Sequence, residues 1–159
     1  MNQTGQPAGF SLIELVIVLA IVGILAVVAA GRVLDIKSDS QINATMTEAN
    51  RLNRLAMIAR ERLGRWPNDA NQGVVPTDLR SVLFPNSFLT TPIGGQWDWN
   101  GPGTTIPRFG MATYFASTTA EPRSQYTKLD TIFDDGNPAS GKIRRHLSGS
   151  KVSWCFLVE

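Results

Sequence analysis

One apolar run near the N-terminus constrains this chain more than any other feature. From Phe10 to Ala30 the sequence reads FSLIELVIVLAIVGILAVVAA, in which Ser11 and the charged Glu14 are the polar exceptions. A helix of about 20 such residues can cross the hydrocarbon core of a bilayer, which is roughly 30 Å thick. The run is longer than the apolar region of an ordinary secretory signal, about 7–15 residues, and no basic residue precedes it. It therefore predicts an anchor rather than a signal that is removed.

Glu14 needs its own explanation, because a carboxylate at membrane depth costs on the order of a few kcal/mol and usually marks function. Gly9 precedes the run and leaves its peptide bond sterically open to a protease. Cleavage after Gly9 would create an α-amino group at Phe10, at the i, i+4 spacing from Glu14 at which helix residues are neighbours. The new ammonium group can pair with Glu14 of the same chain or of an adjacent subunit.

The segment GFSLIELVIVLAIVGIL, residues 9–25, resembles the cleavage and methylation motif of type IV prepilins and type II secretion pseudopilins. The resemblance implies that a prepilin peptidase cuts between Gly9 and Phe10 and N-methylates Phe10. It also implies that Glu14 pairs with the N-terminus of a neighbouring subunit during assembly.

The same resemblance implies a place in the cell. The chain would be a single-pass protein of the bacterial inner membrane with its C-terminal domain outside the cytoplasm. An inner-membrane assembly platform would then move it from the lipid into a cell-surface or periplasmic filament, as a homo-oligomer or with other pilin-like subunits. Prepilin leaders usually carry Lys or Arg and this one carries neither, so the orientation rests on the resemblance and not on charge.

Beyond Gly31 the pattern becomes amphipathic, which predicts that the helix continues to Leu63, where Gly64 and Pro67 stop it. The alternative is two helices joined by a loop at residues 31–40. We expect a leader at 1–9, a membrane and assembly helix at 10–31, an amphipathic continuation at 32–63 and a globular domain at 64–159. The apolar positions of the continuation are Ile42, Met46, Ala49, Leu52, Ala56, Ala59 and Leu63.

The sequence of the globular domain, residues 64–159, predicts loops followed by a small antiparallel sheet that packs on the helix. This arrangement is a pilin-like α+β fold. Residues 65–110 are rich in Pro, Gly, Asn and Thr and are interpreted as loop with brief elements; the tryptophans there are expected to be core residues rather than a carbohydrate platform. Strands are predicted at 111–117, 128–133 and 151–159. In the last strand Trp154 should face the helix and Cys155 should point away from it.

The segment DTIFDDGNPASGK offers oxygen ligands around a tight turn. Asp130, Asp134, Asp135 and Asn137 can supply some of the six to eight oxygens, in round numbers, that Ca²⁺ prefers. Major pseudopilins carry a structural calcium in a comparable loop, but the spacing here is not their ligand pattern. The alternative is a β-turn with solvated carboxylates. No other cofactor is expected.

Composition narrows the function. A net charge of +2 does not indicate a charged partner, and a single cysteine excludes an intramolecular disulfide. With one histidine and one cysteine, the sequence shows no recognisable set of catalytic residues, so we expect no enzyme. The basic cluster at residues 142–146 is interpreted as a solvated or subunit-contact face, and nucleic acid is not expected as a partner. A filament subunit is the preferred function. The alternative is a membrane-tethered extracytoplasmic binding domain, which includes a DNA-uptake or adhesion minor pilin.

Overall fold

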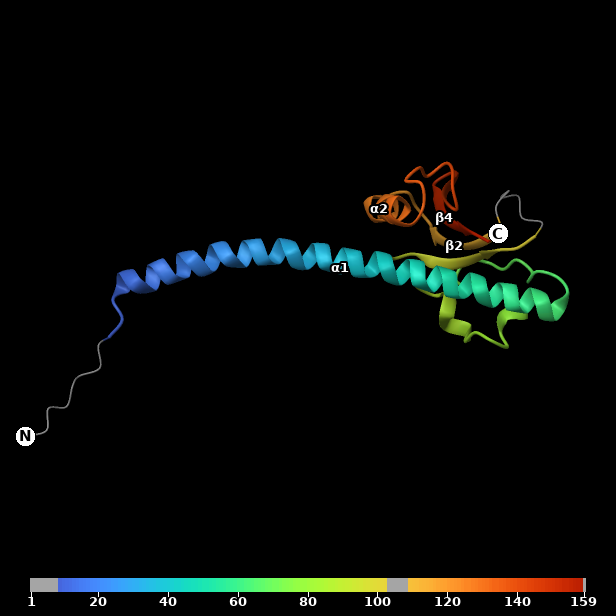
Figure 1. The fold of residues 1–159 in the computed structure, drawn as a ribbon, viewed down its shortest axis with the longest axis horizontal. Coiled ribbons are helices and arrows are strands. Elements are labelled where there is room, and N and C mark those ends of the chain that lie inside the picture. The colour runs from blue at the N-terminus through green and yellow to red at the C-terminus, as the bar shows by residue number, and fades with distance from the viewer. Residues whose placement is uncertain (1–8, 103–108, 159) are drawn as a thin grey trace, which may run out of the picture. The chain divides into compact units, whose positions relative to one another are not determined.

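The computed structural model describes residues 9–102 and 109–158, and it shows a long helix and a four-stranded antiparallel sheet. Helix α1 is Leu12–Leu63, 52 residues without interruption (Figure 1). The continuous helix is confirmed and the alternative loop at residues 31–40 is wrong. Gly31 weakens a helix by about 1 kcal/mol relative to alanine, but unlike proline it removes no backbone hydrogen bond.

The structure forms two units, the first ending at Lys37 and the second beginning at Ser38. In the first unit α1 is apolar from Leu15 to Ala30, and its residues are exposed. In the second unit the rest of α1 packs on the sheet with helix α2, Arg123–Phe133. The expected α+β class is confirmed.

The sheet has the strand order β1-β2-β4-β3, and all neighbouring strands are antiparallel. Strands β2 and β4 overlap the predictions at 111–117 and 151–159. Strands β1 and β3 fall in segments interpreted as a loop and as a solvated or subunit-contact basic cluster. Two short 3₁₀ helices precede the sheet, η1 at Thr77–Leu79 and η2 at Pro85–Phe88. The strands are β1 Gln96–Asn100, β2 Gly110–Phe115, β3 Ile143–Ser148 and β4 Lys151–Leu157.

The strand predicted at residues 128–133 is wrong, because this segment is the second half of α2. Its apolar and β-branched residues suit a strand, but the buried positions are Tyr126, Leu129 and Asp130, the i, i+3, i+4 spacing of one helical face. Tyr126 lies before the predicted segment, and its ring stacks on Trp154 of β4 with centroids 5.2 Å apart. Packing of this face against the sheet therefore favours a helix over the predicted strand.

One face of the sheet and the second half of α1 enclose the core. Trp97 and Trp99 are almost completely buried there, which confirms the prediction for these two tryptophans, while Trp66 is half-buried and packs against the core. Trp154 of β4 is also completely buried. Along α1 the prediction is correct for Ile42, Ala49, Leu52, Ala56 and Ala59, while Leu63 is exposed and Met46 is half-buried. Cys155 is on the opposite face of β4 from Trp154 and is buried as well.

The side chain of Asn53 joins α1 by hydrogen bonds to β2 and β4, the two inner strands of the sheet. Its amide nitrogen donates to the carbonyl of Phe156 on β4 at 3.0 Å, and its oxygen accepts from the backbone N–H of Met111 on β2 at 2.9 Å. Both bonds are buried, so Asn53 satisfies two backbone groups that water does not reach. The sequence prediction counted apolar residues alone and so omitted Asn53, although its spacing from Ala49 and Ala56 places it on the same buried face of α1.

Candidate processing and assembly site

The Gly9–Phe10 bond lies just before α1 in non-helical backbone, and both residues are exposed. The side chain of Phe10 is 85 % exposed. A Cβ atom built at Gly9 would meet open space, so no packing among the residues that the structure describes requires a glycine there. A reason for Gly9 must therefore come from another molecule, and a protease that needs an unhindered peptide bond is one such reason.

Ser11 and Glu14 form a reciprocal capping box at the first turn of α1. The backbone N–H of Ser11 donates to Glu14 Oε2 at 2.8 Å, and the backbone N–H of Glu14 donates to Ser11 Oγ at 3.2 Å. These two bonds satisfy helix-terminal donors that have no partner within the helix. The carboxylate of Glu14 is thus held toward the N-terminal end of the helix, one residue from Phe10.

The sequence interpretation missed Ser11, which it treated only as a polar interruption of the apolar run. The signal was present, because Ser followed three residues later by Glu before an apolar stretch is the sequence signature of a capping box. The sequence singles out Glu14 by the cost of its charge in a membrane, whereas its hydrogen bonds with Ser11 are seen in the structure.

The helix that follows is long and apolar enough to span a membrane, by its length and composition. Its most apolar window has a mean hydropathy of 3.1, and none of that window is buried in the structure. Gly23 and Gly31 lie in this part of α1, and a Cβ atom at either position would meet open space. Each glycine weakens the helix, and the chain gains no intramolecular contact in return.

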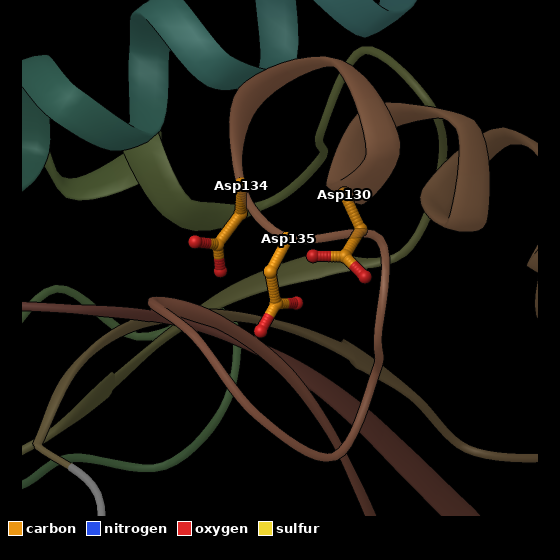
Figure 2. Close-up of side chains that lie close together, drawn as sticks. All are labelled: Asp130, Asp134 and Asp135. Carbon is orange, nitrogen blue, oxygen red and sulfur yellow. The ribbon is translucent and has the colours of Figure 1, made fainter.

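A second candidate site is the acidic cluster at the end of α2, defined as Asp130, Asp134 and Asp135. One carboxylate oxygen of each residue lies within 4.8 Å of the others, and Figure 2 shows the three side chains next to one another. Asp130 is completely buried, and neither of its carboxylate oxygens has a hydrogen-bond partner among residues 9–102 and 109–158. Burial, together with the charges of Asp134 and Asp135, raises the pKa of Asp130 to about 6.

The other two carboxylates hold the loop that leads to β3. Asp134 accepts hydrogen bonds from the backbone N–H groups of Lys142 and Ile143, the second at 2.7 Å. Asp135 accepts from Ser140 Oγ and from the backbone N–H of Asn137, and these bonds lower its pKa. The side-chain oxygen of Asn137 accepts from Ala139 N–H within the same loop. Of the four predicted ligands, the structure therefore groups the three aspartates and uses Asn137 in a local turn.

This arrangement fits a hard divalent cation in part. Three carboxylates lie close together, and the buried carboxylate of Asp130 has no hydrogen-bond partner among the described residues, so a cation would compensate its charge. Loop carbonyl groups and water would have to supply the remaining oxygens.

The interpretation of residues 142–146 as a solvated or subunit-contact face is wrong for Arg145, whose side chain is largely buried within the domain. Its guanidinium pairs with Glu121 at 2.5 Å, and the two side chains are only 12 % and 2 % exposed. Trp154 Nε1 also donates to Glu121, at 2.7 Å. The hydrogen bonds from Arg145 and Trp154 lower the pKa of Glu121 although burial by itself raises it. Arg145 is therefore part of the fold and not of a free basic patch.

Comparison with known families finds the prokaryotic N-terminal methylation motif at residues 6–30. This motif is the signature of type IV pilin and pseudopilin precursors, and it covers Gly9, Phe10, Ser11, Glu14 and Gly23. No curated protein and no solved structure matches the chain. The motif supports a precursor that a prepilin peptidase processes, and it suggests a structural subunit rather than an enzyme.

Proposed function

We propose that this protein is a structural subunit of a type IV pilus-like or type II secretion pseudopilus filament. In this proposal a prepilin peptidase cuts between Gly9 and Phe10 and N-methylates Phe10, and α1 carries the subunit first in the membrane and then in the filament. The observation that carries the proposal is the methylation motif at residues 6–30, which includes the start of an exposed helix that can span a membrane.

The hydrogen bonding and charge of Glu14 support a role for this residue in assembly. In the uncut chain its carboxylate is occupied by the N–H of Ser11. Cleavage after Gly9 places a positive α-amino group beside this cap, and an ion pair with that group or with the same group of a neighbouring subunit compensates the charge in a medium without water. A simple membrane anchor needs neither a carboxylate nor a specific N-terminus.

The glycines of α1 support close packing between helices. Gly23 and Gly31 weaken the helix and serve no contact within their own chain. In a membrane or a filament core, small residues let helix backbones approach closely, and the exposed apolar side chains around them supply the contact area. A bundle of copies of α1 uses both features.

The proposed location in the cell is based on the same features, the methylation motif and the apolar part of α1. We propose a single-pass protein of the bacterial inner membrane, with the domain that begins near Ser38 outside the cytoplasm. An inner-membrane assembly platform would then extract the subunit into a filament with copies of itself or with other pilin-like subunits.

Intact mass spectrometry tests the processing step. Co-expression of the full chain with a prepilin peptidase should give a product that begins at Phe10 and carries one extra methyl group. A catalytically inactive peptidase is the control and should leave the chain uncut. Cleavage at another bond, or an uncut chain with the active enzyme, would contradict the proposal.

Glu14→Ala tests the assembly step. The variant should insert into the membrane and be cleaved as the wild type is, but its incorporation into filaments should fall at least about tenfold, because the compensating ion pair is lost. Glu61→Ala is the matched control, since Glu61 is an exposed acid on the same helix. Normal incorporation of the Glu14 variant would remove this carboxylate from the mechanism.

We further propose that the acidic cluster holds a structural Ca²⁺. Asp130 supports this most directly, because its buried carboxylate has no partner in the described part of the chain. Chelation should lower the melting temperature of the wild type, and the same treatment should not change that of Asp130→Asn. If chelation leaves the wild type unchanged, the cluster holds no structural metal.

A further inference from the structure

The outer face of the sheet, opposite to the face on which α1 and α2 pack, carries an open cavity of about 310 Å³. Its strand residues alternate with the buried tryptophans, so their side chains point away from the core. Cavities that hold small ligands begin at roughly this size. The methylation motif and the acidic cluster lie elsewhere in the chain, so this cavity is independent of the proposed function.

One end of the cavity is acidic. Asp98 is on β1, and Asp69 is on the loop that lies beside β1, where its Oδ1 accepts from the backbone N–H of Gly101 at 3.1 Å. No hydrogen bond to the Asp98 side chain is present among the described residues. Burial, together with the charge of Asp69, raises the pKa of Asp98 to about 7. A cation from outside the chain is the partner that this carboxylate lacks.

The other end of the cavity is basic. His146 on β3 and Lys151 on β4 line it, and Tyr114 on β2 and Ser153 on β4 lie between the two ends. The register places Tyr114, Ser153 and His146 side by side across three strands, with Asp98 two residues along from the position paired with Tyr114. The charged groups of opposite sign thus belong to one cavity but to opposite sides of it.

We propose that this cavity binds a short zwitterionic ligand of about the size of a tripeptide. Its ammonium group lies between Asp69 and Asp98, and its carboxylate lies at Lys151 and His146. The hydroxyl groups of Tyr114 and Ser153 bind the polar groups in the middle of the ligand.

The span of the cavity sets the length of the ligand. A strand spacing of about 4.8 Å and a rise of about 3.3 Å per residue put the backbones of Asp98 and His146 roughly 16 Å apart. The side chains reach into the cavity from both ends and shorten this gap. An extended tripeptide, at about 3.4 Å per residue, fills what remains, whereas a single amino acid is too short to contact both ends.

The test is a titration of the full chain, in detergent micelles at pH 8, with triglycine by isothermal calorimetry. We expect saturable binding with a Kd below about 1 mM. N-acetyl-triglycine lacks the ammonium group and triglycine amide lacks the carboxylate, so each should bind at least tenfold more weakly. This comparison uses the unchanged protein and does not depend on any variant folding correctly.

Variants then locate the site. Asp98→Asn and Lys151→Met should each weaken triglycine binding at least tenfold, while Glu61→Gln, a change at an exposed acid of α1, should leave the affinity unchanged. Absence of saturable binding, equal affinity for the capped and uncapped peptides, or full affinity in Asp98→Asn would each overturn the proposal.

Discussion

Asp98 and Glu121 show how two acids in one small domain acquire opposite properties. Glu121 is buried with a guanidinium and an indole N–H that both donate to it, so it stays ionised. Asp98 is half-buried with another carboxylate nearby and without a donor among the described residues, so its protonated form is favoured. Burial alone does not decide the charge of an acid; the partners that the fold supplies decide it.

Asp98 should make the stability of the wild type depend on pH. Its pKa is about 7 in the folded chain and 3.8 in the reference state, so the folded protein binds more protons between these values. The free energy of unfolding should therefore fall as pH rises from about 4 to about 7 and level off above that. Urea titrations at several pH values measure this, and the slope in the wild type should be steeper than in Asp98→Asn. Identical slopes would contradict the assigned pKa.

Glu121→Ala should destabilise the domain by about 3 kcal/mol, because it leaves the Arg145 guanidinium buried without a counter-charge. Glu48→Ala is the matched control: its partner Arg51 is half exposed, and such pairs contribute at most about 1 kcal/mol. Tryptophan fluorescence during urea unfolding reports both. Equal losses of unfolding free energy in the two variants would show that the buried Glu121–Arg145 pair contributes no more to stability than the exposed pair does.

At the scale of elements, α1 is joined to the sheet by polar as well as apolar contacts. Asn53 makes a buried polar contact between them, since its side chain hydrogen-bonds one backbone group of β2 and one of β4 in place of water. A helix held only by apolar residues can slide or rotate by small steps, whereas a two-bond amide contact specifies one register.

Asn53→Ala should cost about 2 kcal/mol, because a buried backbone N–H and carbonyl lose their partners. Asn50→Ala, three residues earlier at an exposed position of the same helix, should change stability by less than about 0.5 kcal/mol. The difference in urea midpoint between the two variants is the measurement. A small effect at Asn53 would mean that water replaces both bonds.

Ser11→Ala should loosen the first turn of α1 by about 1 kcal/mol, since the capping box loses the hydroxyl that accepts from Glu14 N–H. Amide hydrogen exchange at residues 12–14 in micelles should become faster, while Ser40→Ala, in the exposed interior of the same helix, should leave these amides unchanged. Unchanged exchange in Ser11→Ala would show that the cap does not stabilise the helix end.

At the scale of the whole molecule, the two units differ in what stabilises them. Every buried apolar residue in the described part of the chain lies at Ile42 or later, so the second unit has a core of its own. The described residues of the first unit are exposed, and their apolar surface needs lipid or other subunits.

A fragment that begins at Ser38 should therefore fold without detergent. Its ¹H–¹⁵N spectrum should be well dispersed, with four separate indole signals for the four tryptophans, all of which lie in this fragment. A collapsed spectrum would show that the first unit contributes to the stability of the domain. The full chain in micelles is the reference for the same signals.

The elements that sequence predicted best are those whose signal is local. The methylation motif, the apolar span and the stop at Gly64 each depend on neighbouring residues along α1, and Gly64 has the positive φ of 68° that a helix C-terminus favours. The same local reasoning gave β2 and β4 from their alternation. It also grouped Asp130, Asp134 and Asp135, which lie in the last turn of α2 and just after it, where sequence proximity makes them neighbours.

Sequence by itself thus determined that this chain has a helix that can enter a membrane, with a processing motif before it, because bilayer thickness and helix geometry act on consecutive residues. Only the tertiary structure decided that residues 123–133 are a helix, that Arg145 is buried against Glu121, and that Asp98 and Lys151 share a cavity. These features depend on contacts between residues 24 to 53 positions apart in the chain. Short segments carry too little periodicity to specify such contacts, and the packing of the core selects among the alternatives.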